Sequence, residues 1–169
     1  MSKMTYIKDI KDKDSKEAKK ILTNLGKEAE KYKLLALARA ELESAVGQAF
    51  ISIKKFLGDK YVAYVLEAKK PNELFDIETD DGKKNRKNLI ALQNDFYFKS
   101  MKCTEVSLDM IKIHNIIKAL RQEREVFAKK MFKKYKLDNK KSFKFGFEEN
   151  KIYQVEPDIP EGVKAKNSN

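Results

Sequence analysis

The stretch from Lys83 to Phe145 contains neither glycine nor proline, the two residues that most often interrupt a helix. Apolar residues recur along it at alternating steps of three and four, and only Lys99, Arg124 and Lys134 break the series. This spacing predicts one long helix with a continuous apolar seam. The residues of the seam are Leu89, Leu92, Phe96, Cys103, Val106, Met110, Ile113, Ile117, Leu120, Phe127 and Met131.

A helix from about Asn85 to Tyr135 is on the order of 75 Å long at ~1.5 Å per residue, and it cannot bury its seam against itself. A second helical pattern begins after Asp14 and shifts by about one residue on the way, which changes the supercoil without ending the helix. The two segments are expected to form a long, coiled-coil-like antiparallel hairpin. The earlier pattern is Ala18, Leu22, Leu25, Ala29, Tyr32 and Ala36, then Leu35, Ala38, Leu42, Ala45 and Ala49.

Capping residues and glycines predict where the first helix begins and ends. Asp14 or Ser15 is expected to cap its start. A short first helix could end at Gly26 and a new one begin at the next residue. At Gly47 the apolar pattern continues on both sides, so the helix is expected to run through it. Gly58 and the residue after it are the expected stop.

Residues 59–83 are expected to form the tip of the hairpin. Residues 60–70 suit a strand by composition, but a short helix that ends before Pro71 is preferred. Residues 73–77 are read as a short extended piece, and residues 80–82 as a turn before the long helix starts near Lys84.

Beyond Tyr135 the pattern changes from helix to strand. Aromatic residues alternate with Lys144 and Gly146, and a second apolar run follows Asn150, which predicts a small β-hairpin over 142–156. A lone two-stranded hairpin is marginal in water, so it must pack on the helices, pair with the N-terminal arm or join another chain's sheet. Its expected partner interface is Phe143, Phe145, Phe147, Ile152, Tyr153 and Val155.

The predicted fold is therefore mainly α. An N-terminal arm (1–13) precedes the helical hairpin domain (14–141), the β-hairpin follows (142–156), and a polar tail (157–169) is expected to be disordered by itself.

Few residues suit catalysis or metal binding. His114 and Cys103 are the only histidine and cysteine, which excludes the usual Cys/His zinc sites within one chain, and Cys103 lies on the seam. The acidic segment 76–82 is similar to a calcium loop, but its glycine comes one place late and its twelfth position is Lys87. No phosphate loop or nucleophile elbow occurs, so a non-enzymatic protein without metal or cofactor is expected. The alternative left open is an enzyme whose carboxylates converge in space from different parts of the chain.

The chain carries 37 basic and 26 acidic residues, a net charge of +11, which favours anionic partners. The stretch from Lys118 to Lys141 contains ten basic residues and only three acidic ones, Glu123, Glu125 and Asp138, so its net charge is +7. These residues are the predicted contact to a DNA or RNA backbone, sequence-neutral because most are lysines; the alternative is a solvated face. They are Lys118, Arg121, Arg124, Lys129, Lys130, Lys133, Lys134, Lys136, Lys140 and Lys141.

One local pattern resembles known proteins. The run EVFAKKMFKKYKLD over residues 125–138, followed by a Phe-x-Phe strand and by IYQV over 152–155, resembles the ends of small bacteriophage-encoded helical-hairpin proteins. Such hairpins occur among virion accessory components, prefoldin-like hairpins and host-directed inhibitors. The resemblance covers about thirty residues, carries no catalytic residue and implies a phage-encoded protein.

Two functions remain open from the sequence. The first is a structural or interaction protein that docks onto a larger assembly, such as a virion or packaged genome, through its apolar seam and terminal β-elements, with other subunits as partners. The second is a small protein that binds nucleic acid or inhibits a host factor through the lysine-rich helix end. The first thirty residues lack the apolar h-region of a signal peptide, and no run approaches the ~18 apolar residues of a membrane span. Residence in the host cytoplasm or in the virion is therefore expected.

Overall fold

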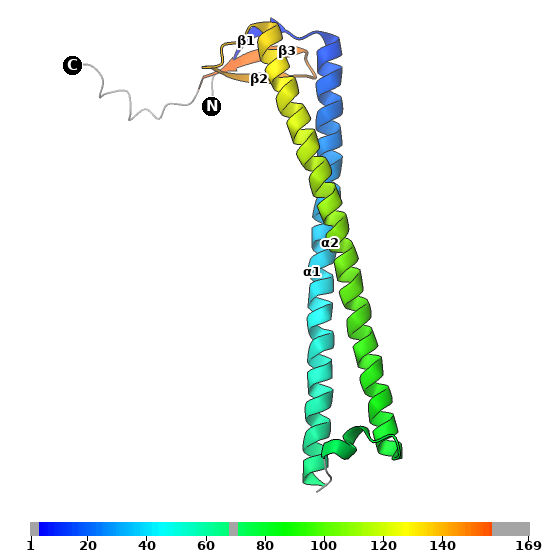
Figure 1. Ribbon diagram of the computed structural model, residues 1–169. Helices are drawn as coiled ribbons and strands as arrows, with labels where there is room; N and C mark the ends of the chain where they lie inside the picture. Colours follow the sequence, from blue (N-terminus) through cyan, green and yellow to red (C-terminus); the bar gives the residue numbers. More distant parts are fainter. Residues whose placement is uncertain (1–3, 68–70, 157–169) are drawn as a thin grey trace, which may run out of the picture. The chain divides into compact units, whose positions relative to one another are not determined.

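The computed structural model describes residues 4–67 and 71–156 (Figure 1). Two long helices, α1 (Asp12–Leu66) and α2 (Asp80–Tyr135), flank a short 3-10 helix, η1 (Pro71–Phe75). Three strands, β1 (Met4–Asp9), β2 (Ser142–Gly146) and β3 (Lys151–Val155), complete the fold. This arrangement confirms the predicted helical hairpin with its small C-terminal β-structure.

The chain divides into two compact units, which are described separately. The helical unit comprises residues 30–114, and the sheet unit comprises the described residues before 30 and after 114. Both α1 and α2 contribute to each unit. Within the described residues, no helix combines the length and the apolar character that crossing a membrane requires.

In the helical unit, α1 and α2 run antiparallel and cover each other's apolar residues. The rings of Phe50 and Phe96 lie 6.1 Å apart between centroids, and those of Tyr32 and His114 lie 6.2 Å apart. The predicted seam residues of this unit, from Leu89 to Ile113, are all partly buried. The seam therefore has its partner inside the same chain, as its length requires.

Helix α1 is longer than predicted at both ends. It continues through Gly26, Gly47 and Gly58 to Leu66, so the predicted stop at Gly58 was wrong. A glycine costs only about 1 kcal/mol in a helix, and the partly buried side chains before and after it keep the helix packed. The preferred helical interpretation of residues 60–66 is confirmed, as part of α1, and residues 68–70 lie outside the described chain.

The start of α1 also differs from the prediction. The helix begins at Asp12, and the carbonyl of Lys11 accepts hydrogen bonds from the backbone N–H groups of Asp14 and Ser15. These two residues are therefore not caps but buried members of the first turn. Their side chains face the interior because α2 and the sheet cover this end of the helix.

The tip is helical rather than extended. Residues 71–75 form η1, and α2 begins at Asp80, so the predicted extended piece, the turn at 80–82 and the start near Lys84 were wrong. Thr79 explains the early start, since its hydroxyl accepts a hydrogen bond from the N–H of Gly82 at 3.0 Å and caps the helix. The buried amide of Asn85 donates to the carbonyl of Leu74 at 3.1 Å and holds η1 against α2.

The predicted β-hairpin is the larger part of a three-stranded antiparallel sheet with the order β1-β3-β2. Phe145 pairs with Ile152 across the hairpin, and Tyr6 pairs with Tyr153 on the other side of β3. Of the three ways to complete the hairpin, the structure uses two: pairing with the N-terminal segment and packing on the helices. Residues 1–3 of the predicted arm and the predicted tail, 157–169, lie outside the described chain.

The core of the sheet unit joins four elements or their flanks. Side chains from the segment after β1, the start of α1, the end of α2 and β3 form one buried cluster. Phe143, Phe145 and Phe147 pack against it. The buried members are Ile10, Ala18, Ile21, Phe127, Met131, Tyr135 and Ile152.

Two glycines of the helical unit give opposite predictions. A Cβ at Gly82 would lie 2.6 Å from the backbone nitrogen of Asp76 and in closer conflict with its carbonyl oxygen, whereas a Cβ at Gly47 would meet open space. We expect Gly82→Ala to lower the free energy of unfolding by about 1–3 kcal/mol through overpacking. Gly47→Ala should raise it by about 0.5–1 kcal/mol through helix propensity. Urea unfolding followed by circular dichroism measures both, and equal effects of the two substitutions would contradict the close packing at Asp76.

Candidate functional site

A buried polar cluster joins the two helices in the sheet unit. Asp14 is only 3% exposed, and its carboxylate accepts hydrogen bonds from Lys134 Nζ at 2.6 and 2.8 Å and from the hydroxyl of Tyr135 at 2.7 Å. The same hydroxyl accepts the backbone N–H of Lys11 at 2.7 Å. The cluster therefore connects the start of α1 to the end of α2.

The cluster determines the protonation of its members. Burial by itself raises the pKa of Asp14, but the hydrogen bonds from Lys134 and Tyr135 outweigh it, so the pKa of this carboxyl lies below its usual value. Burial and the bond to Asp14 raise the pKa of Tyr135. The bond to Asp14 raises the pKa of Lys134. All three shifts keep a carboxylate, a neutral phenol and an ammonium together near neutral pH.

Two of the ten basic residues predicted to bind nucleic acid are thus engaged within the chain. Lys134 binds Asp14, and Lys130 Nζ lies 3.1 Å from both carboxylate oxygens of Glu17. They contact carboxylates of α1, because α1 lies against their face of α2. Their two partners offset two of the seven net charges of this end.

Three other lysines line one open groove. Lys129, Lys133 and Lys136 lie around a hollow of about 660 Å³, with Phe132 and Leu137 as its apolar wall. These lysines make no ion pair with any residue between 4 and 67 or between 71 and 156. The remaining lining residues are Glu125, Ala128 and Asn139.

The end of α2 shapes this groove. The N–H of Leu137 donates a hydrogen bond to the carbonyl of Phe132 at 3.0 Å, and the N–H of Lys136 donates one to the carbonyl of Lys133 at 3.3 Å. Lys136 has a φ of 51°, the left-handed conformation that closes a helix in this way. The turn places Lys136 and Leu137 on the same groove as the last turns of the helix.

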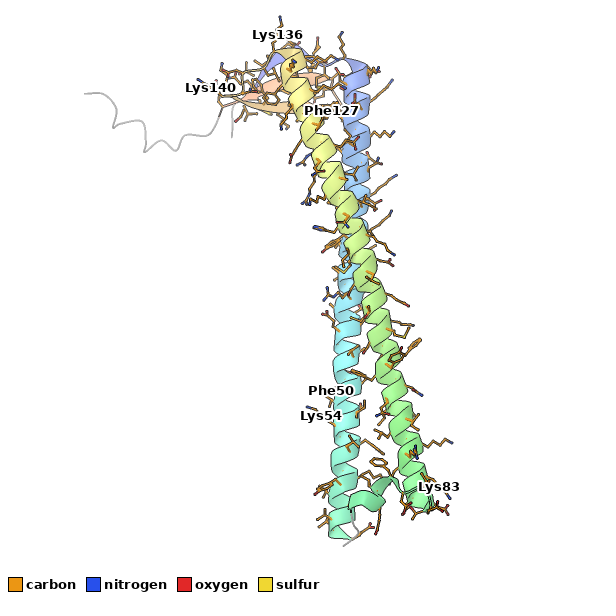
Figure 2. All side chains as sticks on the ribbon, in the orientation of Figure 1. Phe50, Lys54, Lys83, Phe127, Lys136 and Lys140 are labelled. Atoms are coloured by element: carbon orange, nitrogen blue, oxygen red, sulfur yellow. The ribbon has the colours of Figure 1, made fainter. Side chains whose placement is uncertain are left out.

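The remaining predicted basic residues are exposed but do not line the groove. Lys118 and Arg121 lie on α2, and Arg124 borders a separate apolar hollow of about 190 Å³ beside Phe127. Lys140 and Lys141 lie in the turn before β2, where Asp138 accepts their backbone N–H groups. Figure 2 shows Lys136 at the end of α2 and Lys140 beside the strands.

The six residues of the predicted partner interface do not share one surface. Ile152 is fully buried in the chain's own core, so its assignment to a partner interface was wrong. Phe143, Phe145 and Phe147 also face the helices, where Phe132 packs edge-on against Phe143 with centroids 5.7 Å apart. The chain's own helices therefore cover the aromatic face that was expected to need a partner.

Tyr153 and Val155 lie on the opposite face of the sheet. Tyr153 packs edge-on against Tyr6 with centroids 6.4 Å apart, and its hydroxyl bonds to Glu149. Val155 pairs in register with Met4. Met4 and Tyr6 are each about half exposed, so this face keeps a small apolar surface.

Sequence reasoning missed a second apolar row on α2, in the helical unit. Its positions follow each other at steps of four and three, parallel to the buried seam but on the outer side of the helix. Five of its seven positions are large apolar residues that are 45–65% exposed, and Asn94 and Thr104 occupy the other two. We call this row the outer stripe; its apolar members are Ile90, Tyr97, Met101, Leu108 and Ile111.

Residues with catalytic or ligand potential lie apart from these surfaces. His114 is exposed beside Tyr32, and Cys103 is partly buried on the seam. Asp76 accepts the N–H of Glu78 within its own turn at 2.9 Å. In the part of the chain that the structure describes, no group of three His, Cys, Asp or Glu residues converges as a metal site would.

No model of a known protein family, no curated protein and no solved structure matches this chain. The groove, the sheet and the outer stripe are therefore the surfaces on which a function can be proposed.

The cluster around Asp14 predicts acid sensitivity. Because the pKa of Asp14 is lowered in the folded state, its ionised carboxylate stabilises the fold at any pH above the ordinary carboxyl pKa. This stabilisation is lost as the pH falls through the pKa of the folded state. At pH 7, Asp14→Asn should lower the free energy of unfolding by about 2 kcal/mol, the scale of hydrogen bonds to a charged group. The difference from the unmodified protein should shrink toward pH 3 in urea unfolding.

Asp12 provides the matched control, because it lies in the same turn but is exposed, and it forms an ion pair with Lys16 in the next turn. Asp12→Asn should change stability much less than Asp14→Asn. Ser15→Ala is a second control, since its buried hydroxyl has no hydrogen-bond partner among the described residues and its removal should be close to neutral. A loss at Asp14→Asn that does not depend on pH would contradict the assignment.

Proposed function

We propose that this chain is a non-enzymatic interaction protein that docks onto a larger protein assembly through the groove of its sheet unit. The observation that carries the proposal is the combination of three lysines, which form no ion pair among the described residues, with an apolar wall formed by Phe132 and Leu137. Such a surface suits a protein segment that carries both acidic and large apolar side chains. The resemblance to bacteriophage hairpin proteins supports a virion or accessory component as the concrete role.

The composition of the groove favours a protein partner over a nucleic-acid backbone. Glu125 lies among the lining residues and would repel phosphate, whereas it tolerates a mixed peptide surface. The basic residues of the groove are all lysines, which lack the planar fork that binds phosphate in a bidentate way. Phe132 also packs against Phe143 and Phe145, so its ring is not free to receive a stacked base on both faces.

Nucleic-acid binding or inhibition of a host factor remains the second candidate, and one observation favours it. Lys118, Arg121, Lys140 and Lys141 are exposed and make no ion pair with any residue in the described ranges. They add positive charge to the same sheet unit without lining the groove. A polyanion attracted by this charge would respond to the whole basic end rather than to the groove alone.

A charge-matched pair of variants separates the two candidates. We expect Lys129→Glu/Lys133→Glu/Lys136→Glu to weaken binding of a labelled peptide of alternating acidic and large apolar residues by tenfold or more. Lys118→Glu/Arg121→Glu/Lys141→Glu makes the same charge change outside the groove and should weaken it far less. Fluorescence anisotropy with the peptide and with a single-stranded oligonucleotide measures both interactions.

Equal losses in the two variants would contradict docking in the groove and support long-range attraction. Tight oligonucleotide binding with a steep salt dependence, together with no peptide binding, would replace the first candidate by the second. Poly-glutamate serves as a further control, because it supplies the charge without the apolar side chains.

A further inference from the structure

The outer stripe of α2 needs a covering surface that the described chain does not supply. Its five apolar side chains are 45–65% exposed, and they extend over 22 residues of one helix. Scattered exposed apolar residues are normal on a protein, but a row in heptad spacing is the pattern by which helices pair. We propose that a second copy of this chain covers the outer stripe, with the two α2 helices antiparallel.

Charge identifies a second copy as the occupant. The whole chain has a net charge of +11, yet residues 88–117 carry three basic and three acidic side chains and are neutral. Two of the acidic groups are already paired within the helix, Asp95 to Lys99 at 2.6 Å and Asp109 to Lys112 at 2.8 Å. Two copies can therefore approach along this stretch without the repulsion that the rest of the chain imposes.

The neutral stretch is also bounded. Basic residues precede it at Lys83, Lys84, Arg86 and Lys87, and Lys118 follows it. In an antiparallel pair the basic residues before the stripe of one copy lie opposite Lys118 of the other. Their repulsion limits the contact between the two helices to the length of the stripe. A polyanion would bind at these ends rather than along the neutral apolar row.

The order of residues in the stripe is self-complementary when the helices are antiparallel. A two-fold axis close to Met101 brings Tyr97 of one copy opposite the smaller Thr104 of the other, and Leu108 opposite the smaller Asn94. The two polar residues of the stripe, Asn94 and Thr104, then each face an apolar or aromatic side chain rather than each other. The resulting layers are Ile90 with Ile111, Asn94 with Leu108, Tyr97 with Thr104, and Met101 with its own copy.

The residues beside the stripe agree with this register. On one side, Gln93 approaches Ser107 and Ser100 approaches its own copy, so that flank is polar and uncharged. On the other side, Phe98 approaches Glu105 and Ala91 approaches Lys112. Neither flank therefore brings two like charges together in the antiparallel pair.

Disulfide trapping tests the orientation in the full-length protein, with Cys103→Ala as the background. We expect Met101→Cys to form a covalent dimer under mild oxidation, because the axis passes close to this residue. Ile90→Cys alone should not form one, whereas a mixture of Ile90→Cys and Ile111→Cys chains should. Efficient trapping of Ile90→Cys with itself would overturn the antiparallel arrangement.

Sedimentation equilibrium tests the surface itself. Met101→Lys/Leu108→Lys should weaken self-association by roughly 30-fold or more, as expected for central interface side chains. Val126→Lys is a control for adding a lysine to α2, since Val126 is 67% exposed on the same helix but lies outside the stripe, and this substitution should leave association unchanged. Circular dichroism confirms that each variant folds. A monomeric parent protein at every concentration, or a dimer that only Val126→Lys dissociates, would overturn the proposal.

Discussion

The length of the two helices is the constraint on which the rest of the structure depends. A helix of 55 or 56 residues exposes a continuous apolar seam, and no part of the same helix can fold back to cover it. The chain solves this by covering each seam with the other helix. Because the seams are used internally, any partner would have to bind at another surface of the chain.

The polar cluster around Asp14 shows how one end of the pairing is held. A buried carboxylate costs free energy unless its oxygens are bonded, and here Lys134 and Tyr135 from α2 supply the bonds. The backbone N–H of Lys11 then bonds to the same phenol, at the segment that leads from β1 into α1. The cluster thus couples strand pairing to helix packing, which explains why the sheet unit has a single core.

Periodicity alone was sufficient to predict the seam, the end of α2 at Tyr135 and the hairpin over 142–156, because each depends on local spacing of apolar residues. The roles of Lys130 and Lys134 could not be predicted, since they depend on carboxylates of α1 more than 110 residues away. The same limit applies to β1, whose six residues are all exposed and whose partner strand, β3, comes from the other end of the chain. The outer stripe was visible in the spacing of Ile90 to Ile111, but the stronger seam beside it explained the helix without it.

The two proposed surfaces differ in charge, and this difference assigns them to different partners. The groove is basic and belongs to the sheet unit, whereas the outer stripe is neutral and belongs to the helical unit. A neutral stripe allows two strongly basic chains to associate, and a two-fold dimer then carries two basic grooves. Two weak contacts to one assembly act together when their spacing fits, since the second binds at the high effective concentration set by the first. Self-association would therefore strengthen docking without any new contact in the groove, provided that the assembly repeats its acidic segment.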